Sequence, residues 1–532
     1  MSSLQLLALA GVACLLLHKI FIAPLLNPLR DLPSPVQASA FKSFLIEPQP
    51  EQLEQWACEI PNDGLIRYRG ILNKEKLLVT DPQALHQILT VRPYSFCKPP
   101  AITKIIRSLL GDGLVVVEGD VHKVSCCPMI CKAVPSANRQ QSQKRALQPA
   151  FKLRRVKDLY PVFWRKTGQL VRHLSAIADE QKRSHQATNI AVPINNVTLD
   201  IIGIAGFDLD FNCLADPNNQ LATDYARGFA PSKDAQFYRM LAIIFPDAIL
   251  NRLPLRRNQD LRAAVKAVKQ CTSDVIESRR MLLKRDPAMT DGEKGDNTFG
   301  DILGVLMAED GITDTDALVS QSMTFLGAGH DTVSAAVTCA IYELCKNPVV
   351  QSRLRDEIRH SLPFPTTSAQ AALSEGIDNL PYLSVVCNEV FRMHPSVPFL
   401  QRRSLEPVNI GGRVIPKGTS FLTSIKLLNR SPSLWQSDPT VFNPDRWLDD
   451  NSGGAKERYA FMTFSQGARH CIGERFGRAE VMHLLAGLVG RFSFEFAGTG
   501  EDGKSDTLQF EHGITSRIIG GLWVEVKDHG SW

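Results

Sequence analysis

The sequence has little excess charge of either sign, because its 60 Lys and Arg residues nearly balance its 55 Asp and Glu residues. It also has no dense basic tract, so a nucleic-acid partner is not expected. Its 12 cysteines lack the paired spacings of a disulfide framework, which indicates reduced thiols and a body facing the cytosol. Cys126, Cys127 and Cys131 cluster, but with one nearby histidine, His122, and no second C-x-x-C motif, a zinc site is not expected.

The N-terminus carries the longest apolar run, which is interrupted only by His18 and Lys19. The run reaches the ~20 residues of a membrane span if these two lie near one interface. No small-residue cleavage site follows, so an uncleaved anchor over residues 1–26 is predicted, with a cleaved signal peptide as the alternative. Prolines then predict a stiff hinge over residues 27–45, before a body formed by residues 46–532.

Periodicity predicts several elements of this body. Residues 64–80 alternate apolar and polar side chains on both sides of Asn73, which predicts a β-hairpin, and residues 81–90 follow as a helix. Helical periodicity persists over residues 313–344, with the small-residue segment AGHDT at its centre. Residues 286–300 are rich in Gly, Asp and Lys and indicate a surface loop, since their spacing does not match a phosphate-binding loop.

A glycine-rich loop near the C-terminus, FMTFSQGARHCIGERFGRAE, isolates Cys471 just before a predicted helix. Arg469 and the helix N-terminus supply positive potential that favours a thiolate. A cysteine in this position could also be an ordinary half-buried residue or a nucleophile. The spacing of the residues around Cys471 favours a metal ligand. The signature F-x-x-G-x-R-x-C-x-G is filled by Phe464, Gly467, Arg469, Cys471 and Gly473.

This loop resembles the haem-binding loop of the cytochrome P-450 family. The resemblance implies a mainly α fold with a small β subdomain, a haem b cofactor, and Cys471 as the axial ligand of its iron. Glu389 and Arg392 also match the family's E-x-x-R motif, and Arg446 matches its P-x-R-W motif. In the family these three side chains form a buried structural network that shapes the cysteine loop, whereas the residues alone also allow a surface ion pair.

The AGHDT segment supplies the candidate catalytic pair, Asp331 and Thr332. An acid beside an alcohol on a helix is commonly a packing detail, but the resemblance implies that Thr332 stabilises bound oxygen and that Asp331 relays protons. Gly329 is expected to leave room for O₂. Arg402 or Arg403 could neutralise a haem propionate, an anionic partner that suits a guanidinium, and the placement of Arg402 relative to Ser404 favours Arg402.

Residues 124–141 interrupt the helix that the family places over the haem, and Pro128 and Pro135 within them break helical structure. Without this stretch, His122 and Lys144 stand four apart on one helical face. The resemblance then implies that both reach the haem propionates. A retained intron and a genuine surface loop stay open as explanations of residues 124–141.

The resemblance implies a monooxygenase that inserts one oxygen atom from O₂ into a hydrophobic small molecule. Residues 196–214 resemble fungal members, which indicates secondary metabolism such as terpenoid or polyketide tailoring. Candidate pocket residues are Phe325, Val397, Phe399, Leu400 and Ile514. A haem-thiolate isomerase or peroxygenase, and an inactive haem-binding product caused by residues 124–141, are the alternatives.

No flavin or nicotinamide domain is evident, so electrons are expected from a separate, membrane-bound NADPH–cytochrome P-450 reductase. The expected location is the endoplasmic reticulum membrane, crossed once, with the catalytic domain facing the cytosol. Arg475 and Arg478, close to the cysteine loop, are candidates for a docking face for the reductase or for an ordinary solvated helix surface.

Overall fold

The structure is a computed structural model. It describes residues 28–36, 47–118, 147–184, 186–216, 256–285, 300–308, 315–365, 376–448, 452–497 and 509–532, with a few single positions besides. The predicted anchor over residues 1–26 lies almost entirely outside the described residues, and so do residues 124–141, His122 and Lys144. Within the described residues, no helix combines the length and apolar character needed to cross a membrane.

The chain divides into two compact units. The first comprises Met1–Pro99, Pro398–Pro439 and Ala455–His470, and the second comprises Pro100–Val397, Thr440–Gly454 and Cys471–Trp532. The boundary therefore falls inside the cysteine loop, between His470 and Cys471.

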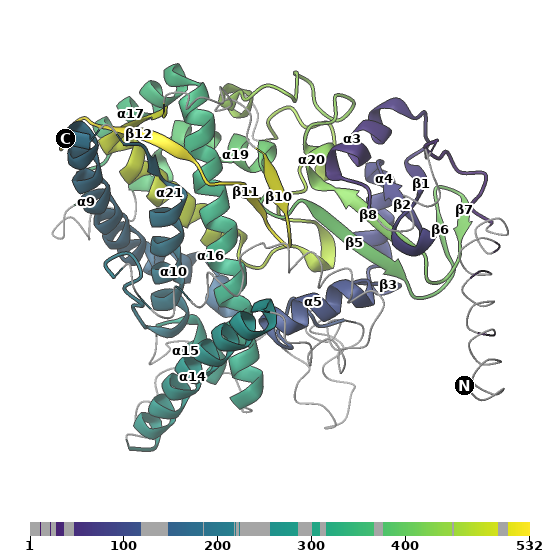
Figure 1. The fold of residues 1–532 in the computed structure, drawn as a ribbon, viewed down its shortest axis with the longest axis horizontal. Helices are drawn as coiled ribbons and strands as arrows, with labels where there is room; N and C mark the ends of the chain where they lie inside the picture. Colours follow the sequence, from purple (N-terminus) through teal and green to yellow (C-terminus); the bar gives the residue numbers. More distant parts are fainter. Residues whose placement is uncertain are drawn as a thin grey trace. The chain divides into compact units, whose positions relative to one another are not determined.

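The first unit contains the larger sheet (Figure 1). Its elements are α3 (Pro50–Glu59), β1 (Leu65–Arg69), η2 (Ile71–Asn73), β2 (Glu75–Val79), α4 (Pro82–His86), η3 (Gln87–Val91), β3 (Phe96–Cys97), β5 (Phe399–Ser404), β6 (Val408–Ile410), β7 (Arg413–Ile415), β8 (Ser420–Ser424), α20 (Ile425–Asn429), η9 (Arg458–Ala460) and η10 (Gly467–Arg469). The strand order is β1-β2-β8-β5-β3, in which only β2 and β8 are parallel.

The predicted hairpin over residues 64–80 is present as β1 and β2, in antiparallel register with Ile66 opposite Leu78. Asn73 adopts a φ of 52° before β2, a left-handed conformation that asparagine tolerates well. One face of the sheet is buried against Leu53 and Trp56 of α3. The helix expected over residues 81–90 is also present as α4 followed by the π-helical turn η3.

The second unit contains most of the helices. Its elements are α5 (Pro100–Leu110), η5 (Gln148–Phe151), α8 (Leu153–Asp158), α9 (Tyr160–Ser184), β4 (Thr188–Asn189), α10 (Ala191–Phe207), α14 (Arg256–Arg285), α15 (Ile302–Ala308), α16 (Thr315–Lys346), α17 (Pro348–Ser361), η7 (Ile377–Asn379), α19 (Pro381–Met393), η8 (Pro444–Trp447), α21 (Glu474–Arg491), β9 (Phe492–Phe496), β10 (Phe510–His512), β11 (Ser516–Ile518) and β12 (Trp523–Asp528).

The long helix predicted over residues 313–344 is α16, which spans 32 residues, or about 48 Å at 1.5 Å per residue. Figure 1 shows it as the long helix running through the helical unit. Most of its side chains are buried, because α10, α14, α19 and α21 pack around it. Predominantly apolar and small residues on every side permit this burial.

Gly329 serves the packing of α10 against α16. A Cβ atom at Gly329 would lie 2.8 Å from Cδ1 of Ile202 on α10, closer than side chains normally approach. Ile202 fills the position that a Cβ atom at Gly329 would occupy, whereas the expectation that Gly329 leaves room for O₂ stays a prediction. The glycine allows two helices to come close together.

Candidate active site

Cys471 stands three residues before the first residue of α21, and its side chain is exposed. Gly473 is the N-cap residue of this 18-residue helix, and Glu474 begins its first turn. The unsatisfied N–H groups and dipole at a helix N-terminus stabilise a negative charge placed there. The local structure thus favours the thiolate form of Cys471, the form that binds metals.

The preceding part of the loop belongs to the first unit and is held there by Asn429 of α20, which is fully buried. The Asn429 side chain donates to Thr463 Oγ1 at 2.8 Å and accepts from the Met462 backbone N–H at 2.8 Å. Phe464 lies next to Phe461, with 6.4 Å between ring centroids. No sequence motif pointed to Asn429 as a support of this loop.

Gly467 begins η10, the short helix that also contains Arg469. Its φ of 71° is left-handed, and a Cβ atom there would lie 2.3 Å from the Leu89 carbonyl oxygen. Only glycine fits both conditions. By contrast, Gly473 has a φ of −88°, and a Cβ atom there would make only an ordinary contact of 3.9 Å with Phe151.

Arg402 and Arg403 are adjacent on β5, so their side chains leave opposite faces of the sheet. Arg402 is 7% exposed, and its Nη1 donates to the Gln401 carbonyl at 2.8 Å. Arg403 Nε donates to the Gly418 carbonyl at 3.1 Å. Arg403 is therefore engaged with the turn before β8, and the preference for Arg402 as the propionate contact stays a prediction.

The middle of α16 is accessible along one short stripe. Ala328 is exposed, and Asp331 and Thr332 are half-buried, although the helix is almost wholly buried on either side of them. Thr332 Oγ1 donates to the Ala328 carbonyl at 2.8 Å. This bond uses the hydroxyl proton of Thr332. The hydroxyl oxygen can still accept a hydrogen bond through its lone pairs.

The Asp331 carboxylate is held by two side chains from the C-terminal hairpin. Arg517 Nη2 lies 2.6 Å from Asp331 Oδ1, and the Thr515 hydroxyl donates to Asp331 Oδ2. Ser396 Oγ donates to the Thr332 carbonyl at 2.8 Å. These partners are far from AGHDT in sequence, and the sequence alone did not identify them.

His330, between Gly329 and Asp331, faces away from the stripe. It is 1% exposed, and its Nε2 lies 3.1 Å from Asn195 Oδ1 on α10. Burial lowers the pKa of His330 to about 4, against the opposing influence of Asp331. The imidazole is therefore neutral at physiological pH and joins α10 to α16.

Within the second unit, Phe151 connects the helix that follows Cys471 to α16. Its ring centroid lies 6.1 Å from that of Phe325 on α16 and 6.5 Å from that of Phe476 on α21. Gly477 of α21 faces Val333, the residue after Thr332, at 3.7 Å from its would-be Cβ atom. The accessible stripe and the Cys471 helix are thus joined in one packed core. Phe325 is 6% exposed, so packing accounts for it without a pocket.

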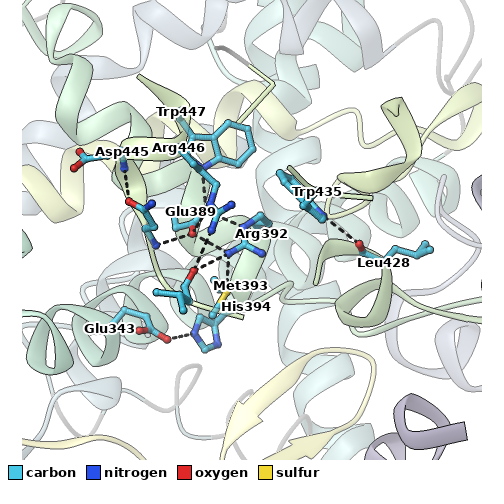
Figure 2. Close-up of polar contacts among 12 residues, drawn as sticks. Glu343, Glu389, Arg392, Met393, His394, Leu428, Trp435, Asp445, Arg446 and Trp447 are labelled. Atoms are coloured by element: carbon cyan, nitrogen blue, oxygen red, sulfur yellow. Dashed lines mark hydrogen bonds and ion pairs between the residues drawn. The ribbon is translucent and has the colours of Figure 1, made fainter. Parts of the chain in front are cut away.

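Glu389 lies at the centre of a fully buried polar network (Figure 2). Arg392 donates to both of its oxygens, through Nε to Oε2 and Nη2 to Oε1, each at 2.8 Å. Arg446 Nε donates to Oε1 at 3.0 Å. Glu389, Arg392 and Arg446 therefore meet as the E-x-x-R and P-x-R-W motifs predict, and the surface ion pair is excluded by their burial.

Two further donors complete the network. Trp447 Nε1 donates to Glu389 Oε2 at 2.9 Å (Figure 2). The Asn443 backbone N–H donates to Oε1 at 2.8 Å. The carboxylate thus receives five hydrogen bonds from α19 and the segment around η8. A buried charge needs such partners, because desolvation would otherwise make it costly. The network is structural, since all of its groups bind one another.

Arg478 is engaged within the second unit, and its part in a docking face stays a prediction. Its guanidinium donates to Glu474 Oε1 at 2.8 Å and to Asn388 Oδ1 at 2.5 Å, and it lies over the Phe391 ring. It therefore joins α21 to α19. Arg475 is exposed and stays a candidate for partner contact.

The chemistry of the thiols fits a haem-thiolate ligand at Cys471. In the described part of the chain only Cys58 and Cys471 are exposed, and Cys58 lies inside α3. Burial raises the pKa of Cys345 to about 12 and that of Cys387 to about 12, so neither supplies a thiolate. Cys471 alone combines exposure with a helix N-terminus among the described cysteines, and Gly473 leaves space beside it.

The family model described as Cytochrome P450 matches residues 130–518. The chain belongs to the cytochrome P450 family. Cytochrome P450 monooxygenase sphH from Aspergillus fumigatus is 38% identical over 500 residues, covering 92% of this chain and 87% of the relative. ALT8 from Alternaria alternata is 35% identical over 524 residues, covering 88% and 84%. FUM15 from Gibberella moniliformis is 34% identical over 555 residues, covering 94% and 88%.

The match identifies the chain as a cytochrome P450 monooxygenase, and hence as an oxidoreductase. The cytochrome P450 fold, mainly helical with a small β region, agrees with the expected fold class. Membership implies the family's haem-thiolate cofactor, its use of O₂ and its need for a redox partner.

Proposed function

We propose that this chain uses haem b to insert one oxygen atom from O₂ into a hydrophobic small molecule. The overall reaction is RH + O₂ + NADPH + H⁺ → ROH + H₂O + NADP⁺. The observation that carries the proposal is the packing of the exposed Cys471 and its helix in the same unit as the accessible Asp331–Thr332 stripe of α16.

Each residue would have a distinct task. Cys471 would give its thiolate to the iron, and Arg402 and Arg469 would neutralise haem propionates, as guanidinium groups do for carboxylates. When bound, the haem supplies electron storage and oxygen activation, which no side chain provides. Thr332 would accept a hydrogen bond in the accessible stripe, and Asp331 would hold or pass the protons that the reaction consumes. His122 and Lys144 would add propionate contacts.

An apolar substrate agrees with the residues around the stripe. Ala328 is exposed there, and Ile514 at the hairpin turn is 42% exposed. Fungal relatives over most of the chain support a place in secondary metabolism, such as terpenoid or polyketide tailoring. An untargeted search for products in a host with and without the expressed chain tests this assignment.

Electrons would come from an NADPH–cytochrome P450 reductase at the endoplasmic reticulum membrane. Residues 1–26 would anchor the chain by a single span, with the catalytic body in the cytosol; their apolar composition supports this. Fractionation of the full chain and a chain lacking residues 1–26 tests the anchor. Equal recovery of both in the membrane pellet after carbonate washing would contradict it.

The oxygen source separates monooxygenation from the peroxygenase alternative. With ¹⁸O₂, NADPH and reductase, we expect one ¹⁸O atom in each product molecule. Turnover with H₂O₂ alone, and none with NADPH and reductase, would favour the peroxygenase. The Asp331–Thr332 pair supports the O₂ route, because proton delivery is needed when O₂ is the oxidant.

We further propose that residues 124–141 derive from a retained intron. Their removal places His122 and Lys144 on one helical face, whereas Pro128 and Pro135 oppose a helix. Sequencing the mature transcript tests this proposal, and a message that keeps all of these codons would exclude it. Expression of both forms, with haem content as the readout, tests whether the stretch abolishes cofactor binding.

A further inference from the structure

The last hairpin binds Asp331 directly and is linked to Thr332 by way of Ser396. Thr515 and Arg517 bind the two oxygens of the Asp331 carboxylate. Between them, the Ser516 backbone N–H donates to the Ser396 carbonyl at 2.8 Å, and the Ser396 hydroxyl donates to the Thr332 carbonyl. One short stretch of β11 and its turn therefore reaches both members of the candidate catalytic pair.

The hairpin has other attachments that do not involve Asp331. The Ser516–Ser396 backbone bond is one, and Phe510 of β10 is another, because its ring centroid lies 6.0 Å from that of His394. His394 Nε2 lies 2.6 Å from Glu343 Oε1 on α16, and both side chains are nearly buried (Figure 2). The hairpin is thus docked on α16 without the Asp331 contacts.

The ion pair adds little to stability. The side chains of Arg517 and Asp331 are 30% and 15% exposed, and ion pairs accessible to solvent contribute little to the free energy of unfolding. Its effect on geometry is larger. A free aspartate samples several χ1 and χ2 rotamers, whereas simultaneous bonds to Oδ1 and Oδ2 select one. These contacts therefore act mainly by fixing the direction in which the Asp331 carboxylate points.

We propose that Thr515 and Arg517 are positioning residues for Asp331, which fix its carboxylate beside Thr332 so that protons are delivered along one route. The inference rests on the proposed monooxygenase function and extends it to the C-terminal hairpin. Thr515 and Arg517 act through Asp331. If the hairpin only formed one side of the site, its attachments to Ser396 and His394 would be sufficient, and the Thr515 and Arg517 side chains would not be needed.

The test compares Arg517→Gln and Thr515→Val with Thr515→Ser, which keeps the hydroxyl. Arg491→Gln is the matched control, because Arg491 and Asp528 form an equally close Arg–Asp pair at 2.7 Å, at the far end of α21 from Cys471. Holoenzyme is supplied with NADPH and a purified fungal reductase, without added organic substrate. The first readout is the ratio of H₂O₂ released to NADPH consumed.

Disturbed proton delivery releases reduced oxygen as H₂O₂, so Arg517→Gln and Thr515→Val should raise this ratio by roughly twofold or more; this is far below the ~10²–10⁴-fold contribution of a proton-transferring group itself, because Asp331 is retained in both variants. Thr515→Ser and Arg491→Gln should keep the wild-type ratio. The second readout, independent of turnover, is hydrogen exchange over residues 509–519. Because the hairpin keeps its other attachments, Arg517→Gln should speed exchange there by roughly fivefold at most.

Faster hairpin exchange with an unchanged H₂O₂ ratio would show a purely structural contact and overturn the positioning role. A raised ratio in Arg491→Gln would also overturn it, because any lost ion pair would then have the same effect. The reduced, carbon monoxide-bound spectrum distinguishes a failure of the proposed function from a failure of the positioning role. Loss of the red-shifted thiolate band in the wild type would refute the proposed function itself, whereas an intact band with an unchanged ratio in Arg517→Gln refutes only the positioning role.

Discussion

Replacing Trp447 by phenylalanine tests whether the Glu389 network stabilises the second unit. The change keeps an aromatic ring and removes the Nε1–H donor, which lies 2.9 Å from Glu389 Oε2. That oxygen then keeps only Arg392 Nε as a partner among the described residues. A hydrogen bond to a buried charge contributes about 1.5–3 kcal/mol, so the free energy of unfolding should fall by that amount, in addition to the effect of the smaller ring.

Trp435→Phe provides the control for ring size. Trp435 is 2% exposed, and its Nε1 donates to the neutral Leu428 carbonyl at 3.3 Å (Figure 2). A neutral bond contributes about 0.5–1.5 kcal/mol, so Trp447→Phe should be the more destabilising by roughly 1 kcal/mol. With slopes of about 2–3 kcal/mol per M, its urea midpoint, followed by far-UV circular dichroism, should lie about 0.3–0.5 M lower. Equal midpoints for the two variants would refute the argument.

Three other variants report on the helix that follows Cys471 and on the loop around it. Burial raises the pKa of Glu480 well above its usual range, so the folded chain keeps a proton that the unfolded chain loses above about pH 4.5. Glu480→Gln should therefore stabilise the protein more at pH 8 than at pH 5, by up to ~1.4 kcal/mol per pH unit; equal shifts in urea midpoint would contradict this. Gly473→Ala should fold normally, because a Cβ there meets only Phe151, at 3.9 Å. It should bind less haem per chain, because the added methyl group would take up the space beside Cys471. Gly467→Ala should instead prevent normal folding, because its Cβ would clash with the Leu89 carbonyl. Full haem content in Gly473→Ala would show that haem does not approach Gly473.

The sequence predicted elements that are specified locally. Alternation on both sides of Asn73 predicted the β1–β2 hairpin, because a strand buried on one face requires a side-chain period of two. Sustained helical periodicity predicted α16, although the helix continues to Lys346, beyond the predicted end at residue 344. Helix ends depend on capping and on neighbours, so their positions are the harder part to predict.

Contacts between distant residues could not be predicted from local pattern. The Asp331 carboxylate binds Thr515 and Arg517 across 184 and 186 residues of sequence. The packing of Gly329 against Ile202 was likewise not predicted, because the identity of a packing partner depends on how two helices cross. The contacts of Glu389 with Arg392 and Arg446 were predictable, because the E-x-x-R and P-x-R-W motifs of the family imply them.

The assignment of Cys471 as the thiolate ligand of a haem is best tested by the reduced, carbon monoxide-bound difference spectrum of the full chain and of Cys471→Ser. The wild type should show the red-shifted Soret band of thiolate-ligated haem. Cys471→Ser should keep the far-UV circular dichroism of the helices and lose that band. A red-shifted band that survives in Cys471→Ser, or a haem-loaded wild type without it, would contradict the account.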